Sequence, residues 1–481
     1  MAVIVKKRYW VTALVVVGLG VAAVLGGWFS RSEIPPLTLG DGNPIYRPYG
    51  GFADGAYGNG RWLVVFSTSR KDSSGYTGDD ILVSRSQDGG TTWSVPQPIA
   101  LDPSSTTTDC YFPAVRWGGG NHFITAWLAR FDLPGITATQ FEIRVSHSWD
   151  SGATWTPPHR LPIRPKPYDF DGYWLHLSTD QQANWVISLS VAERKHPSYT
   201  AKYGYCLVSR DDGKSWSEEL EMPSKNLLLG HYRYSNIPSS SWKTQITSGI
   251  LFAAATDQGF YMDIPGTQSR VFVTTSKDGG VTWTGSRLIG STEDGIPGEF
   301  VRLGAQEWGI AWVMQPLQHK YDIARCSLGF SMTTDNGKTW TTQPDYTADA
   351  SAEVAQYYSQ PVLACDQKRH IIAVWNWRKW TGNCGILVSQ SKDNGATWTP
   401  PRELRKPSSA LKSHEYRQKV AYGLFKTTGL DYLNIHSDMG DWAWRIITDA
   451  NGTWLLLFYE YGGKLSVLRS TDNGATWKRP E

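Results

Sequence analysis

The chain has 481 residues, and its 47 basic and 44 acidic side chains give a formal net charge of +3, which argues against a nucleic-acid binder with a concentrated basic stripe. Hydrophobic residues make up 40% of the chain, which excludes a disordered protein. The sequence is rich in Gly and Trp and contains many short Val/Ile/Thr/Tyr runs, which together predict an all-β fold. The five cysteines form no Cys/His cluster, so we expect no structural zinc site and assign no metal or cofactor.

The N-terminus has the pattern of a membrane anchor. Lys6, Lys7 and Arg8 precede an apolar run from Val11 to Phe29. At about 1.5 Å per residue, this run is long enough to cross a hydrocarbon core of about 30 Å. We therefore expect a cytoplasmic stub and transmembrane helix in residues 1–30, a linker in residues 31–36, and a domain outside the cytoplasm in residues 37–481. A cleaved signal peptide is the alternative and would make the protein secreted, but its usual apolar core has only about 7–15 residues.

One pattern, S/T-x-D-x-G-x-S/T-W, organises the rest of the chain. Consecutive copies are 57 to 79 residues apart, measured between their aspartates. In a hairpin turn the aspartate accepts backbone N–H bonds, the glycine allows positive φ, and the hydroxyls close local hydrogen bonds. We therefore expect these aspartates to be structural rather than catalytic. The seven copies contain Asp88, Asp150, Asp211, Asp278, Asp335, Asp393 and Asp472.

Two strands are predicted before each copy of the pattern. The first is strongly apolar, as in Trp62–Phe66, and the second leads into the pattern, as in Ile81–Arg85. With a preceding strand and a short following segment, each repeat has four strands, and seven such repeats predict a seven-bladed β-propeller. Six blades are the alternative. We expect residues from Pro36 to Asn43 to supply the outer strand of the last blade and close the ring as one domain.

The repeated pattern resembles the Asp-box, or BNR repeat, of the sialidase (neuraminidase) superfamily, and the resemblance runs from Ile45 to Trp477. It implies a propeller with its ligand site on the face opposite the repeats. Sialidases use three arginines for the substrate carboxylate, an aspartate as acid/base, and a tyrosine nucleophile polarised by a glutamate. The glutamate is needed because a phenol is a weak nucleophile at neutral pH. Propellers with this repeat also cleave glycans by elimination or only bind them.

The resemblance also suggests individual site residues. It implies catalytic roles for Asp72, Glu299 and Tyr358, and substrate binding by Arg47, Arg70, Arg378 and Glu460. The sequence departs from the family pattern at two places. Met314-Gln315 stands where a second substrate arginine is expected, and Asp441-Trp442 replaces the expected Tyr-Ser of the last blade. Tyr357-Tyr358-Ser359 has the right local sequence but lies one blade earlier.

The resemblance implies a sialidase-like exo-glycoside hydrolase that acts on terminal acidic sugars, such as sialic acid or a related keto-sugar acid, of extracytoplasmic glycans. The expected partners are a glycan substrate and, through the N-terminal helix, a membrane. Two alternatives remain open. One is a polysaccharide lyase on the same propeller, with a Tyr or His base and an Arg that neutralises a uronate. The other is a non-catalytic propeller that binds glycans or proteins.

Overall fold

The computed structural model describes residues 53–72, 75–99, 107–131, 140–161, 170–196, 199–223, 243–247, 250–256, 271–289, 295–314, 327–347, 357–358, 361–378, 384–405, 442–460 and 464–480. Within these ranges the regular elements are all β-strands, and no helix there is long and apolar enough to span a membrane. The predicted N-terminal helix and the predicted ring-closing strand over residues 36–43 lie outside these ranges.

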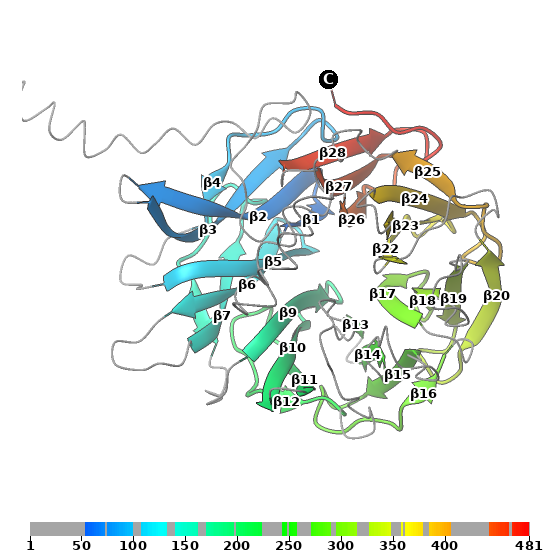
Figure 1. Ribbon diagram of the computed structural model, residues 1–481, viewed down its shortest axis with the longest axis horizontal. Coiled ribbons are helices and arrows are strands. Elements are labelled where there is room, and N and C mark those ends of the chain that lie inside the picture. Colours follow the sequence, from blue (N-terminus) through cyan, green and yellow to red (C-terminus); the bar gives the residue numbers. More distant parts are fainter. Residues whose placement is uncertain are drawn as a thin grey trace, which may run out of the picture.

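The strands form seven antiparallel sheets, the blades of a propeller (Figure 1). The first three blades contain β1 (Ala53–Gly58), β2 (Arg61–Asp72), β3 (Gly75–Ser86) and β4 (Gln97–Pro98); β5 (Thr107–Gly119), β6 (His122–Phe131), β7 (Gln140–Ser148) and β8 (His159–Leu161); and β9 (Phe170–Thr179), β10 (Trp185–His196), β11 (Tyr199–Ser209) and β12 (Leu220–Glu221). The next two contain β13 (Lys243–Thr247), β14 (Ile250–Thr256), β15 (Val271–Ser276) and β16 (Arg287–Leu288); and β17 (Gly295–Arg302), β18 (Trp308–Met314), β19 (Ser327–Thr333) and β20 (Thr341–Thr347). The last two contain β21 (Tyr357–Tyr358), β22 (Val362–Cys365), β23 (Ile371–Arg378), β24 (Cys384–Ser391) and β25 (Arg402–Arg405); and β26 (Trp442–Thr448), β27 (Trp454–Glu460) and β28 (Lys464–Ser470).

The predicted all-β propeller with seven blades is confirmed, and the six-bladed alternative is wrong. Consecutive strands are neighbours in each blade, except β21 and β22 of the sixth. The strands β1, β5, β9, β13, β17, β22 and β26 surround the axis of the ring (Figure 1). In the sixth blade, both β21 and β22 pair with β23. In the seventh blade, Lys478 pairs with Arg469 on the outer side of β28.

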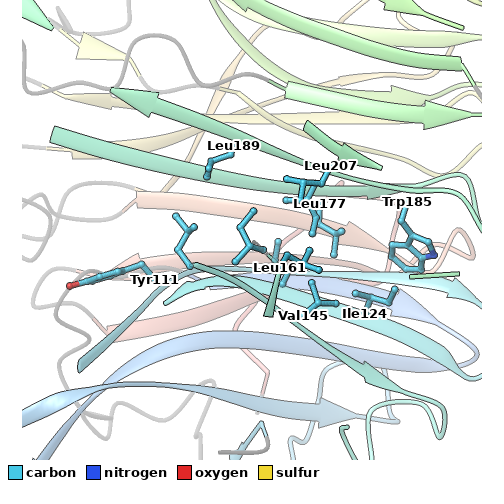
Figure 2. Packing of buried hydrophobic residues seen from close by; sticks show 13 residues of the cluster. Tyr111, Ile124, Val145, Leu161, Leu177, Trp185, Leu189 and Leu207 are labelled. Atoms are coloured by element: carbon cyan, nitrogen blue, oxygen red, sulfur yellow. The ribbon is translucent and has the colours of Figure 1, made fainter. Parts of the chain in front are cut away.

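The hydrophobic core lies between the blades. Seven clusters of buried residues form, and each joins the strands of two neighbouring blades. Figure 2 shows the cluster between the second and third blades, where Ile124 and Val145 face Trp185 and Leu207. The cluster of Trp62 with residues of the last blade closes the ring, and β1 packs directly against β26. Since burial of apolar area is the main stabilising term, closure stabilises the first and last blades together.

The repeated pattern forms seven hairpin turns between the third and fourth strand positions, which we call the repeat turns. In the third turn, Asp211 accepts hydrogen bonds from the hydroxyls of Ser215 (2.6 Å) and Ser209 (2.8 Å) and from the Ser215 backbone N–H (2.8 Å). The Trp216 indole donates to the Gly213 carbonyl. The Ser215 bonds are the main reason that the pKa of Asp211 falls to about 2. These bonds agree with the structural role expected for the repeat aspartates.

A pair of histidines lies between the second and third blades on the side of the repeat turns. His122 Nε2 is 3.1 Å from His147 Nδ1, and the pKa of His147 falls to about 4 because it is buried and lies beside His122. Asp212 and His159 also act on His147, the first raising its pKa and the second lowering it. In the sixth blade the position of His147 is held by Gln390, which donates a hydrogen bond to the Gly474 carbonyl (2.5 Å).

Acid should therefore weaken this blade interface through His147. The folded protein keeps the imidazole neutral down to about pH 4, whereas the unfolded chain takes up the proton near pH 6.5. The stability contributed by this group is complete above about pH 6.5 and is lost as the pH falls towards 4. After allowance for partial exposure, we expect a loss of about 2 kcal/mol.

Chemical denaturation at a series of pH values checks this expectation with His147→Gln, which copies the sixth blade. The variant should lose the part of the pH dependence between about pH 6.5 and 4 that comes from His147, while His122 and His370, whose pKa values burial also lowers, keep their contributions. His159→Gln, which changes an exposed imidazole with the smallest influence on His147, should leave most of the dependence intact. An unchanged slope in His147→Gln would contradict the assignment.

Candidate functional site

The strand directions define two faces of the propeller. The turn between the first and second strands lies beside the repeat turn of the same blade, as shown by the hydrogen bond from the Ser151 N–H to the Asn121 carbonyl (2.9 Å). The first strands therefore begin, and the second strands end, at the opposite face. The resemblance to sialidases implied that the ligand site lies there.

The backbone brings most of the predicted site residues to this opposite face. Arg70 and Asp72 end β2, Arg378 ends β23 and Glu460 ends β27. β21 consists of Tyr357 and Tyr358, and it pairs with β23 through Arg378 and Trp377. Tyr358 and Arg378 are thus on adjacent strands of one blade. Arg47 lies outside the described residues, and the roles assigned to these residues stay predictions.

Glu299 is the predicted catalytic residue whose side-chain contacts the structure describes. It sits on β17 where the pairing with β18 shifts between Pro297 and Phe300. Its carboxylate accepts a hydrogen bond from Arg445 on β26. The same carboxylate is 3.7 Å from Nε2 of His176 on β9. Glu299 therefore connects the innermost strands of the fifth, seventh and third blades.

Asp54 on β1 extends this network. It accepts hydrogen bonds from the backbone N–H groups of Gly55 (2.8 Å) and Val115 (3.1 Å) and from the Arg116 side chain. Nε of Arg445 lies 3.2 Å from Oδ1 of Asp54, the oxygen that also accepts from Gly55. We call Asp54, Arg116, His176, Glu299 and Arg445 the axial cluster.

The five residues of the axial cluster lie at the same depth around the ring axis. Arg116, His176, Glu299 and Arg445 are each three residues from the end of their strand, and Asp54 is four. At about 3.3 Å per residue, this level is about 10 Å from the strand ends nearest the repeat turns. The Arg445 and Glu299 side chains are each 15% exposed, so the network is mostly shielded from bulk water.

Two guanidinium groups and two carboxylates balance the charge of the axial cluster when His176 is neutral. Burial and the charge of Arg116 lower the pKa of Arg445 to about 10, and Asp54 partly offsets them. Arg445 therefore remains charged at neutral pH, and its contact favours the ionised form of Glu299. An anionic carboxylate in this position suits a general base or a group that polarises a phenol, and it suits a proton donor poorly.

Four members of the axial cluster were not among the predicted site residues: Asp54, Arg116, His176 and Arg445. The predicted site residues came from motifs that resemble those of sialidases, and these four residues belong to no such motif. Their signal is a polar residue between apolar neighbours, as for His176 between Leu175 and Leu177. Within the described ranges, no group of three His, Cys, Asp or Glu side chains could hold a metal ion.

Comparison with known proteins finds solved structures that are similar to this chain. No family model and no curated protein sequence matches the chain. A Hadza microbial sialidase is 15% identical, with a TM-score of 0.41 over 67% of this chain and 62% of that one. Trypanosoma rangeli sialidase in complex with sialic acid is 16% identical (TM-score 0.40, 71% and 54% covered). An ulvan lyase of polysaccharide lyase family PL25 is 12% identical (TM-score 0.45, 90% and 94% covered). The chain thus spans less than two thirds of these two sialidases, and the similarities concern the fold alone.

Proposed function

We propose that this protein is a glycan-active enzyme of sialidase-like type, an exo-glycoside hydrolase that removes terminal acidic sugars from extracytoplasmic glycans. The observation that carries the proposal is the position of Glu299, whose carboxylate is held by Arg445 beside His176 at the axis of the propeller. Such a carboxylate is the group that a tyrosine nucleophile requires.

The remaining roles follow the resemblance to sialidases. Tyr358 is the nucleophile in this proposal, and it belongs to the blade next to that of Glu299. Asp72 is the acid/base, while Arg47, Arg70 and Arg378 bind the substrate carboxylate and Glu460 braces Arg47. Because the axial cluster is charge-balanced, preference for an anionic sugar falls to these arginines. Residues 1–30 would anchor the propeller to a membrane and place it outside the cytoplasm.

Turnover of fluorogenic sialosides and keto-sugar-acid glycosides by the full-length protein tests the proposal. Glu299→Gln should lower kcat by at least about 100-fold, the usual contribution of a positioned base. Its amide retains a hydrogen-bond acceptor for Arg445, so the fold should survive. Glu142→Gln is the matched control, because Glu142 pairs with Arg144 (2.5 Å) on β7, away from the axis. Full turnover in Glu299→Gln would exclude the mechanism.

Lyase chemistry is the second candidate, favoured by one observation. His176 lies 3.7 Å from Glu299, and Arg445 is bonded to the same carboxylate, so a base and a cation are close together. A lyase needs a base for the proton next to a uronate carboxylate and a cation to neutralise that carboxylate. Uronate polymers incubated with the protein would then give an unsaturated product that absorbs ultraviolet light, which hydrolysis does not form.

A further inference from the structure

Trp149 breaks the repeat pattern on the face of the repeat turns. It occupies the position between the serine and the aspartate of the second turn, and 49% of its surface is exposed. At this position the other six turns all have hydrophilic residues, namely Gln87, Arg210, Lys277, Thr334, Lys392 and Thr471. A large indole at a site where six equivalent turns carry polar side chains is not required by the turn itself.

Side chains of two blades hold the indole in a fixed orientation. The Trp149 ring stacks on His122 with centroids 3.8 Å apart and planes within 5°. His147 is parallel to both rings and 3.1 Å from His122 through their ring nitrogens. Asp212 fixes the base of this stack, since it accepts a hydrogen bond from Trp185 (3.0 Å) and lies 3.1 Å from His122 Nδ1. One face of Trp149 is therefore covered by His122, and the exposure belongs to the other face and the edge.

We propose that Trp149 is the platform of a carbohydrate-binding subsite that takes a neutral pyranose ring of a glycan chain. The face of an indole carries partial negative charge and attracts the partly positive C–H groups on one side of a pyranose. The indole needs no ordering when a sugar binds, because the stack beneath it already fixes its orientation. This lowers the free-energy cost of binding. Asp212 and the exposed Lys214 lie at the blade boundary and balance each other in charge, which suits a neutral sugar.

The surroundings of Trp149 favour a sugar over a protein partner. A stable protein interface buries more than about 1,000 Å² around a cluster of apolar anchors. The other large hydrophobic residues that are exposed in the described part of the chain are Val95 in the first blade and Val281 and Leu288 in the fourth. A single indole with charged neighbours matches the footprint of one sugar ring.

This subsite lies on the face of the repeat turns, whereas the proposed catalytic residues lie at the axis and the opposite face. It would hold a long glycan to the protein at a second point and raise the effective concentration of chain ends. The inference goes beyond the proposed catalytic function and does not depend on it. Glu299→Gln should bind sugars at the subsite as well as the wild-type protein does.

Calorimetric titration of the full-length protein in detergent with cellohexaose, chitohexaose, maltohexaose and xylohexaose tests the inference. We expect the wild type to bind at least one of these probes with a Kd below about 10 mM. Trp149→Lys and Trp149→Gln, which copy other repeat turns, should weaken that binding at least about tenfold. Trp149→Phe should keep most of it, and Lys392→Ala, at the same position of the sixth blade, should change nothing.

Three outcomes would overturn the inference. The first is that the wild type binds none of the four hexaoses at about 10 mM. The second is that Trp149→Lys and Trp149→Gln bind as the wild type does. The third is that the substitutions abolish association with phosphatidylcholine vesicles and leave hexaose binding intact, which would make the indole a membrane contact.

Discussion

Replacing Arg445 with methionine is expected to lower the free energy of unfolding by about 3–5 kcal/mol. The guanidinium group contacts Glu299 of the fifth blade and Asp54 of the first blade from its own position in the seventh. Methionine fills a similar volume but leaves both carboxylates without this partner in a largely shielded place. Removal of one partner from a buried ion pair costs more than replacement of the whole pair.

Urea unfolding followed by tryptophan fluorescence measures this effect. Asp54 keeps Arg116 and two backbone N–H groups as donors, so Glu299 should account for most of the loss. The double variant Arg445→Met/Glu299→Gln should therefore recover part of the stability, because it removes the unpaired charge. A free energy of unfolding for Arg445→Met within about 1 kcal/mol of the wild type would show that water already solvates these groups.

The blade architecture could be predicted from the sequence because its signals are local. Each repeat turn is specified by side chains at most four residues apart, such as Asp211 with Ser209 and Ser215. The apolar strands between these turns have nowhere to bury their side chains except against the next repeat. The number of turns therefore fixed the number of blades.

The axial cluster could not be predicted in the same way. Alternation along a strand shows that a residue such as His176 faces away from its apolar neighbours, but not which residue it meets. Arg445 and Glu299 are 146 positions apart and come from blades that are not adjacent. Their contact depends on the diameter of the closed ring and on the shifted pairing beside Glu299. These are properties of the assembled propeller, and no short segment encodes them.

The repeat glycines have one property that the local sequence predicts and one that depends on the assembled propeller. Positive φ was predictable from the turn, and Gly337 has a φ of +82°. The contact with the neighbouring blade was not predictable. A Cβ added at Gly337 would lie 2.5 Å from Cε1 of Phe252 and 3.1 Å from Cγ2 of Thr275, both of the fourth blade. The fifth repeat turn therefore touches the core of the blade before it.

Gly337→Ala is accordingly expected to destabilise the protein by about 2–4 kcal/mol. The left-handed backbone costs a residue with a Cβ about 1 kcal/mol. Overlap with Phe252 adds about 1–3 kcal/mol, because the ring is fully buried and cannot move away without opening the interface between the fourth and fifth blades. The loss should appear as a lower urea midpoint.

Gly60→Ala separates the two contributions to this loss. Gly60 also has positive φ (+70°), but nothing lies within 4 Å of the Cβ that alanine would add. Gly60→Ala should therefore lower the free energy of unfolding by only about 1 kcal/mol, the cost of the left-handed backbone. The difference between the two variants then measures the steric part, which reports how tightly the repeat turn is fitted to the preceding blade. Equal losses in the two variants would mean that the glycine is required by its backbone conformation alone, and that the blades are held together by their apolar strands without help from the turns.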